Sequence, residues 1–144
     1  MNTSSSVNTL QTATAAFEAG AGLALLSFPS VAVALLLGVP LETPASLAVA
    51  RVGGAALLTL GVAFWIARGD TQSAAARGLV TAMVVYNLGV ALILAAAGVR
   101  TQPVGILLWP AVVLHVSMTV WCVMSLLSGK PEGPELGNAV RAHE

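Results

Sequence analysis

The chain has 144 residues, of which 57% are hydrophobic and only 8% are charged, and its mean hydropathy is +0.89. Soluble domains carry about 25% charged residues, so this chain lacks the polar side chains that would cover a water-exposed surface. The formal net charge is zero, which excludes the basic balance typical of nucleic-acid-binding proteins. A single cysteine excludes an internal disulfide and a cysteine-cluster metal site. The composition therefore predicts an integral membrane protein with no nucleic-acid partner.

The chain opens with residues 1–12, which are rich in Ser, Thr and Asn and contain no Lys or Arg. They lack the positive region of a secretory signal, so we expect an uncleaved, flexible tail. The first apolar stretch, residues 13–39, is long enough to cross a bilayer, which takes about 20 helical residues. It carries Glu18 near its start and Pro29 near its middle. Because proline has no backbone N–H to donate, we expect a kink at Pro29.

Three further apolar stretches follow at residues 45–67, 77–99 and 104–127. Each is long enough for one transmembrane helix, and short polar loops separate them. Residues 129–144 are rich in Gly, Pro and charge, so we expect a second flexible tail there. The sequence therefore predicts an all-α membrane protein, an antiparallel bundle of four transmembrane helices within residues 13–128.

The arginines and the lysine in the loops predict the orientation. With four spans, both termini and the loop between the second and third spans lie on the same side of the membrane. That side carries Arg68, Arg77, Lys130 and Arg141, whereas the other side carries only Arg100. Cytoplasmic loops hold an excess of Lys and Arg, so we expect a multi-pass protein with both termini in the cytoplasm.

The only charge in the second stretch is Arg51. At about 100° per residue, Gly54, Gly61 and Trp65 fall on the same side of the helix as Arg51. Membrane helices approach each other closely at small residues, and a charge at a helix centre costs roughly 2.5–3.5 kcal/mol on insertion scales. We therefore expect Arg51 to face protein neighbours, and outward snorkelling of its long side chain stays open as an alternative.

Depth in the membrane decides which polar side chains can meet. At a rise of about 1.5 Å per residue from the loops, Asn87 and His115 lie near the midplane, with Tyr86 beside them and Arg51 about 7 Å closer to the outer side. Trp109 lies at the depth of Arg51 and offers a cation–π face. These five residues form the predicted ligand-binding cluster, which would hold a small anion or polar headgroup, or carry protons through His115.

Structural roles compete with this prediction. Asn87 and His115 are also suited to hydrogen bonds between packed helices, and Trp109 to the aromatic belt at the membrane interface. Glu18 is expected near the cytoplasmic end, roughly 15–20 Å from Arg51 by the same helical rise. A Glu18–Arg51 ion pair is therefore not expected.

Several chemistries find no support in the motifs. The chain has no HExxH, GxSxG or Walker sequence. Of its two histidines, one falls in the predicted tail, so a bis-histidine haem and a metal site are not expected. We assign no catalytic residue, no metal and no cofactor. An enzyme using His115 as acid or base would need a second titratable group within about 3 Å.

The layout resembles the small four-helix bacterial membrane proteins of DoxX-like type. The resemblance rests on short motifs: Ala50-Arg51-x-x-Gly54, Tyr86-Asn87, and Leu108-Trp109-Pro110 with His115. It implies the bacterial inner membrane and a shared fold more than a shared activity, and some members are linked to quinone or redox partners. No family catalytic residue is carried over, and the lone Cys122 gives no redox pair.

Three function hypotheses follow. The first is a non-enzymatic membrane protein that binds lipid, quinone or a small polar ligand, or that serves as an accessory subunit of a larger complex. The second is a small transporter or permeation unit, dimeric in order to enclose a path, lined by Arg51 and His115. The third is a membrane enzyme that uses His115 as acid or base.

Overall fold

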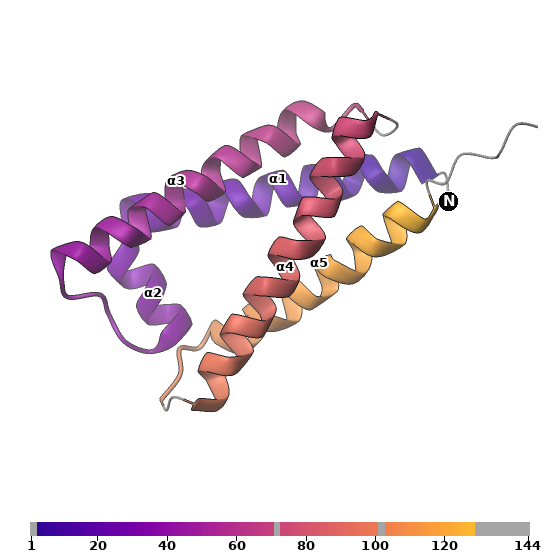
Figure 1. Cartoon of the computed structure of the whole chain (residues 1–144). Coiled ribbons are helices and arrows are strands. Elements are labelled where there is room, and N and C mark those ends of the chain that lie inside the picture. Colours follow the sequence, from indigo (N-terminus) through magenta and orange to yellow (C-terminus); the bar gives the residue numbers. More distant parts are fainter. Residues whose placement is uncertain (1–2, 71–72, 101–102, 129–144) are drawn as a thin grey trace, which may run out of the picture.

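The computed structural model describes residues 3–70, 73–100 and 103–128, which fold into helices joined by loops, with no strand among them. The helices are α1 (Thr3–Ser27), α2 (Pro29–Leu37), α3 (Pro44–Ala67), α4 (Ala74–Arg100) and α5 (Leu108–Ser128) (Figure 1). The tail predicted over residues 129–144 lies outside the described residues.

The N-terminal part differs most from the sequence prediction. Helix α1 begins at Thr3, so residues 3–12 are helical where the sequence predicted a flexible tail over residues 1–12. The expected single span over residues 13–39 is two helices, α1 and α2, whose axes are bent by 115°. The break follows from Pro29, which starts α2 and disfavours helical geometry at the residue before it. Phe28 accordingly has φ −134° and ψ 56°.

Three helices, α3, α4 and α5, are each long and apolar enough to cross a membrane, and the bent α1–α2 pair makes a fourth candidate. Their bounds lie close to the stretches predicted at residues 45–67, 77–99 and 104–127. The coarse prediction of a multi-pass, all-α membrane protein therefore agrees with the described part of the chain.

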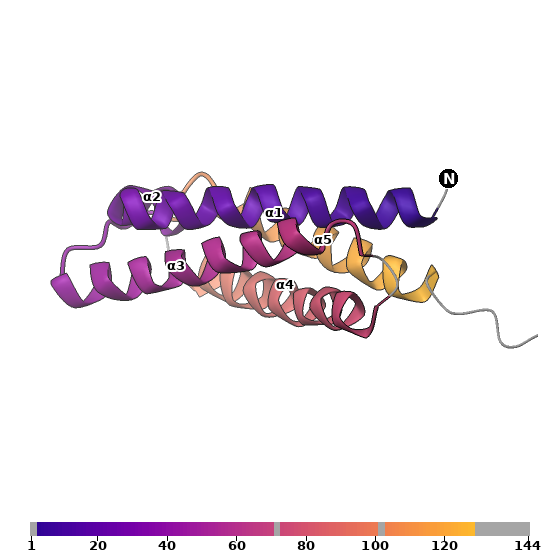
Figure 2. The ribbon, with the colours of Figure 1, turned by 90° about the horizontal axis from the view of Figure 1, so that it is seen from above.

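Helices α1 and α3 pack along each other as an antiparallel pair (Figures 1 and 2). Their backbones touch at glycines: a Cβ added to Gly22 would lie 2.6 Å from the Leu58 amide nitrogen and 2.7 Å from the Gly54 carbonyl oxygen. A Cβ at Gly61 would lie 2.8 Å from the Ala19 amide nitrogen. The prediction that Gly54 and Gly61 line a close helix contact is confirmed.

Helices α4 and α5 form the second antiparallel pair. The two pairs converge at the end of the molecule that holds the α3–α4 loop and diverge toward the opposite end (Figure 1). The apolar core occupies the convergent end. It consists of Leu10, Ala15, Phe64, Val80, Met83, Met118 and Cys122.

The short helix α2 lies at the divergent end, between the α1–α3 pair and the α4–α5 loop (Figure 1). The Leu107 amide donates a hydrogen bond to the Leu35 carbonyl at 2.9 Å, which ties the start of α5 to α2. Gly38 ends α2 with a left-handed φ of 82°, and Gly105 packs directly on the Leu35 carbonyl. Glycine is required at Gly38 because its backbone conformation is one that other residues rarely adopt.

Candidate functional site

The centre of the candidate site is a hydrogen bond between α4 and α5. Asn87 is 1% exposed, and its Nδ2 donates to the Met83 carbonyl at 2.9 Å. Its Oδ1 therefore faces His115 and accepts a hydrogen bond from the His115 Nδ1 at 2.7 Å. Since a carbonyl oxygen can only accept, the proton of a neutral His115 lies on Nδ1 and its Nε2 keeps a lone pair. The expected proximity of Asn87 and His115 is confirmed.

Tyr86 extends this site from α4 toward α1. Its ring meets the half-buried His115 ring edge to face, with centroids 5.9 Å apart and an interplanar angle of 78°. The Tyr86 hydroxyl is placed to donate a hydrogen bond to the Glu18 carboxyl. The structure thus brings Tyr86, Asn87 and His115 together, as the sequence predicted, and adds Glu18 to them.

Glu18 is the functional candidate that sequence reasoning placed wrongly. Its side chain is 6% exposed, and no lysine or arginine among the described residues pairs with it. The prediction put Glu18 near a helix end because it began the first helix at residue 13. Since α1 begins at Thr3, Glu18 lies well inside the helix. The missed signal is the spacing of Gln11, Thr14 and Glu18, which puts three polar residues on one helical face.

Gln11 and Thr14 continue the polar face of α1 toward the α3–α4 loop. Both are buried, at 0% and 1% exposed. The Gln11 Nε2 donates to the Asp70 carbonyl at 3.1 Å. The Gln11 Oε1 and the Thr14 hydroxyl have no hydrogen-bond partner in the part of the chain that the structure describes. We call Gln11, Thr14 and Glu18 the α1 polar row.

Arg51 does not join the site, so the expectation that it faces protein neighbours is wrong for the single chain: its side chain is exposed. The buried face of α3 is centred on Gly54, Gly61 and Phe64. Arg51 lies about 90° around the helix from that centre, at about 100° per residue. The face assigned from Gly54 and Gly61 was right, but Arg51 lies at its edge. Outward snorkelling, the open alternative, fits this position.

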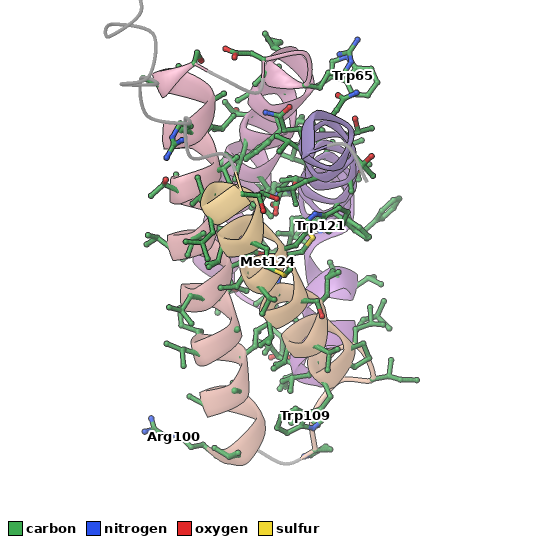
Figure 3. The ribbon with its side chains drawn as sticks, turned by 90° about the vertical axis from the view of Figure 1, so that its right-hand side faces the viewer. Trp65, Arg100, Trp109, Trp121 and Met124 are labelled. Atoms are coloured by element: carbon green, nitrogen blue, oxygen red, sulfur yellow. The ribbon has the colours of Figure 1, made fainter. Side chains whose placement is uncertain are left out.

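Trp109 is also outside the cluster. It is 47% exposed, and its ring packs near Gly98. Figure 3 shows Trp109 and Arg100 at the lower end of the molecule and Trp65 at the upper end, as expected for an interfacial belt. The cation–π contact of the described residues is formed by Arg68, 3.9 Å above the Trp65 ring.

The position of Arg51 gives a first prediction. We expect Arg51→Leu to change the free energy of unfolding in detergent by less than about 0.5 kcal/mol, because exposed substitutions without packing partners have effects of that size. Arg100→Leu, which changes another exposed arginine, is the matched control. Thermal unfolding of both variants measures the difference. A much larger loss of unfolding free energy in Arg51→Leu than in Arg100→Leu would mean that the Arg51 side chain makes a contact that the single chain does not form.

The described residues contain no group of three His, Cys, Asp or Glu side chains that could hold a metal ion. The fold and site define a multi-pass α-helical membrane protein with a polar cluster between its helix pairs. No family model, curated protein or solved structure matches the chain. The resemblance to DoxX-like proteins therefore stays a prediction.

Proposed function

We propose that the chain is a non-enzymatic membrane protein that binds a small amphipathic ligand at His115, with quinol-type molecules as the best fit. The observation that carries this proposal is the hydrogen bond from His115 Nδ1 to Asn87 Oδ1. It fixes the ring and leaves Nε2 as a hydrogen-bond acceptor with no partner among the described residues. A ligand hydroxyl is the complementary donor. His115 is only half-buried, so part of its side chain is open to a ligand.

The chemistry around His115 favours binding over catalysis. An acid–base pair needs a second titratable group within hydrogen-bond reach of the histidine or of bound substrate. The Tyr86 ring meets His115 edge to face, and the Tyr86 hydroxyl is directed to Glu18 instead. The third hypothesis, an enzyme using His115 as acid or base, therefore has less support than ligand binding.

A transport or permeation unit is the second candidate, favoured by the buried Glu18. Carboxylates and histidines inside membrane bundles commonly mark ion pathways and proton relays. The lining residues that we propose are Glu18 and His115, with the exposed Arg51 removed from the path.

The surroundings of the protein are also proposed here. The exposed apolar side chains support membrane lipids as direct partners, and the DoxX-like resemblance supports the bacterial inner membrane. Arg68 and Arg77 flank the α3–α4 loop, which supports cytoplasmic termini by the positive-inside rule. A homodimer or a larger membrane complex stays a prediction.

Native mass spectrometry tests the binding proposal. The full chain is released from mild detergent with a short-chain ubiquinol added as the probe. We expect the wild type to retain the quinol and His115→Ala to bind it about tenfold more weakly, the effect of losing one hydrogen bond worth about 1.4 kcal/mol.

Ser117→Ala is the matched control, because Ser117 is exposed on the same helix and hydrogen-bonds only the Val113 carbonyl. It should bind as the wild type does. Equal quinol retention by all three proteins would contradict a site at His115.

A further inference from the structure

The α1 polar row consists of buried groups that the ligand proposal does not use. Gln11, Thr14 and Glu18 are 0%, 1% and 6% exposed and lie on one face of α1. They span about 10 Å along the helix, at about 1.5 Å per residue. An apolar face would pack at this position without the desolvation that buried polar groups require, so their presence calls for a role.

Two atoms of the row are unsatisfied. The Gln11 Oε1 and the Thr14 hydroxyl are fully buried and have no hydrogen-bond partner within residues 3–70, 73–100 and 103–128. Buried polar atoms are paired in the large majority of cases, and exceptions commonly mark a functional group or an ordered water. Both atoms belong to side chains between the α3–α4 loop and Glu18.

The two ends of the row reach different surroundings. At one end, Gln11 donates to the Asp70 carbonyl in the α3–α4 loop, at the convergent end of the molecule. At the other end, Glu18 faces the Tyr86 hydroxyl, and the Tyr86 ring contacts His115. The row therefore leads from a loop to the titratable groups at the centre of the bundle.

We propose that Gln11, Thr14 and Glu18 form a proton path from the α3–α4 loop to a proton-accepting carboxyl at Glu18. A proton enters from water at the loop and passes along water held by the Gln11 Oε1 and the Thr14 hydroxyl. The last water receives a proton from the water before it and gives one to the Glu18 carboxylate, so an O–H bond forms at Glu18 as one breaks on a water that stays neutral. A hydroxyl suits this position because it donates and accepts hydrogen bonds at once.

The groups around Glu18 fit a proton site better than a metal-ion site. Tyr86 of α4 is the titratable group that faces the carboxyl, and His115 of α5 lies behind its ring. A metal cation needs several oxygens around one point. The three residues of the row are instead spread over two helical turns, so they suit sequential transfer.

The experiment measures exchange of the Glu18 carboxyl proton with solvent. The full chain is reconstituted in phosphatidylcholine vesicles, and infrared spectra are recorded after a change from H₂O to D₂O. The protonated-carboxyl C=O band that disappears in Glu18→Gln identifies the residue. We expect exchange to slow at least tenfold in Thr14→Val, which keeps the shape of the side chain but removes its hydroxyl.

Thr12→Val is the matched control, since Thr12 lies on the exposed face of α1, and Thr14→Ser should keep the wild-type rate because it keeps the hydroxyl. Gln11→Leu serves as a second path variant if Thr14→Val does not fold. The absence of a Glu18 band at every pH at which the protein stays folded would overturn the proposal. Exchange in Thr14→Val as fast as in the wild type, with raised thermal stability, would also overturn it and leave the row structural.

This proposal goes beyond ligand binding and does not depend on it. A wild type that exchanges the Glu18 proton through Thr14 but retains no quinol would keep the proton path and remove the ligand site. Quinol binding that depends on His115, without an effect of Thr14→Val on exchange, would keep the ligand site and remove the proton path.

Discussion

A Gly22→Leu substitution is expected to lower the free energy of unfolding by about 3 kcal/mol, the upper part of the usual cost of overpacking a tight interior. At this position α1 and α3 touch through their backbones, with the Leu58 amide nitrogen 2.6 Å from the place of a Cβ. Backbone atoms cannot swing away as a side chain does, so α1 must move off α3. Thermal or chemical unfolding in detergent measures the loss.

Gly20→Leu is the control for this substitution. Gly20 lies in the same helix, and nothing lies within 4 Å of a Cβ added to it. Its midpoint of unfolding should equal that of the wild type or be slightly higher, because leucine favours a helix more than glycine does. If Gly22→Leu proved as stable as Gly20→Leu, the close α1–α3 contact would be contradicted.

A Gly105→Ala substitution is expected to release α2 from the α4–α5 loop. Its methyl group would overlap the Leu35 carbonyl and lie 2.6 Å from the carbonyl carbon of Leu36. Accommodating it would break the hydrogen bond from the Leu107 amide to Leu35, so the expected loss is about 2 kcal/mol. The rate of hydrogen exchange at the Leu107 amide, measured by mass spectrometry, should rise strongly.

Gly89→Ala provides the comparison for Gly105→Ala. Gly89 lies inside α4 with nothing within 4 Å of an added Cβ. Alanine there should stabilise the helix by roughly 0.5–1 kcal/mol and leave exchange at Leu107 unchanged. Unchanged exchange in Gly105→Ala would mean that α2 is held by other contacts.

The sequence predicted best those features that depend only on the length of an apolar stretch and on helical periodicity. Apolar length predicted the positions of α3, α4 and α5, and helical spacing predicted that Gly54 and Gly61 lie at a helix contact. Counting residues from the loops also brought Asn87 near His115. These properties depend on local helical geometry, which is nearly the same in every helix.

The predictions that failed concern helix starts, packed faces and bend angles, which local sequence patterns do not determine. The predicted depth of Glu18 depended on where α1 begins. The Ser- and Thr-rich start was interpreted as a tail, although Leu10 and Gln11 within it are buried. Whether Arg51 is buried depended on which side of the Gly54 and Gly61 face packs against α1, because Arg51 lies at the edge of that face. Pro29 predicted a kink but not its angle of 115°, and in the structure α2 is also held to the α4–α5 loop by the hydrogen bond from Leu107 to Leu35.

The divergence of the two helix pairs makes the two ends of the protein unequal in width (Figure 1). At the α3–α4 loop the four long helices converge, whereas at the opposite end α2 is added and the pairs separate (Figure 1). A bilayer adjusts to a protein whose shape does not match it by deforming around it, at an energetic cost. We therefore expect a bilayer around this protein to deform more at the wider end of the helices than at the narrower end. Lipids whose shape suits that deformation are expected to lower its energetic cost.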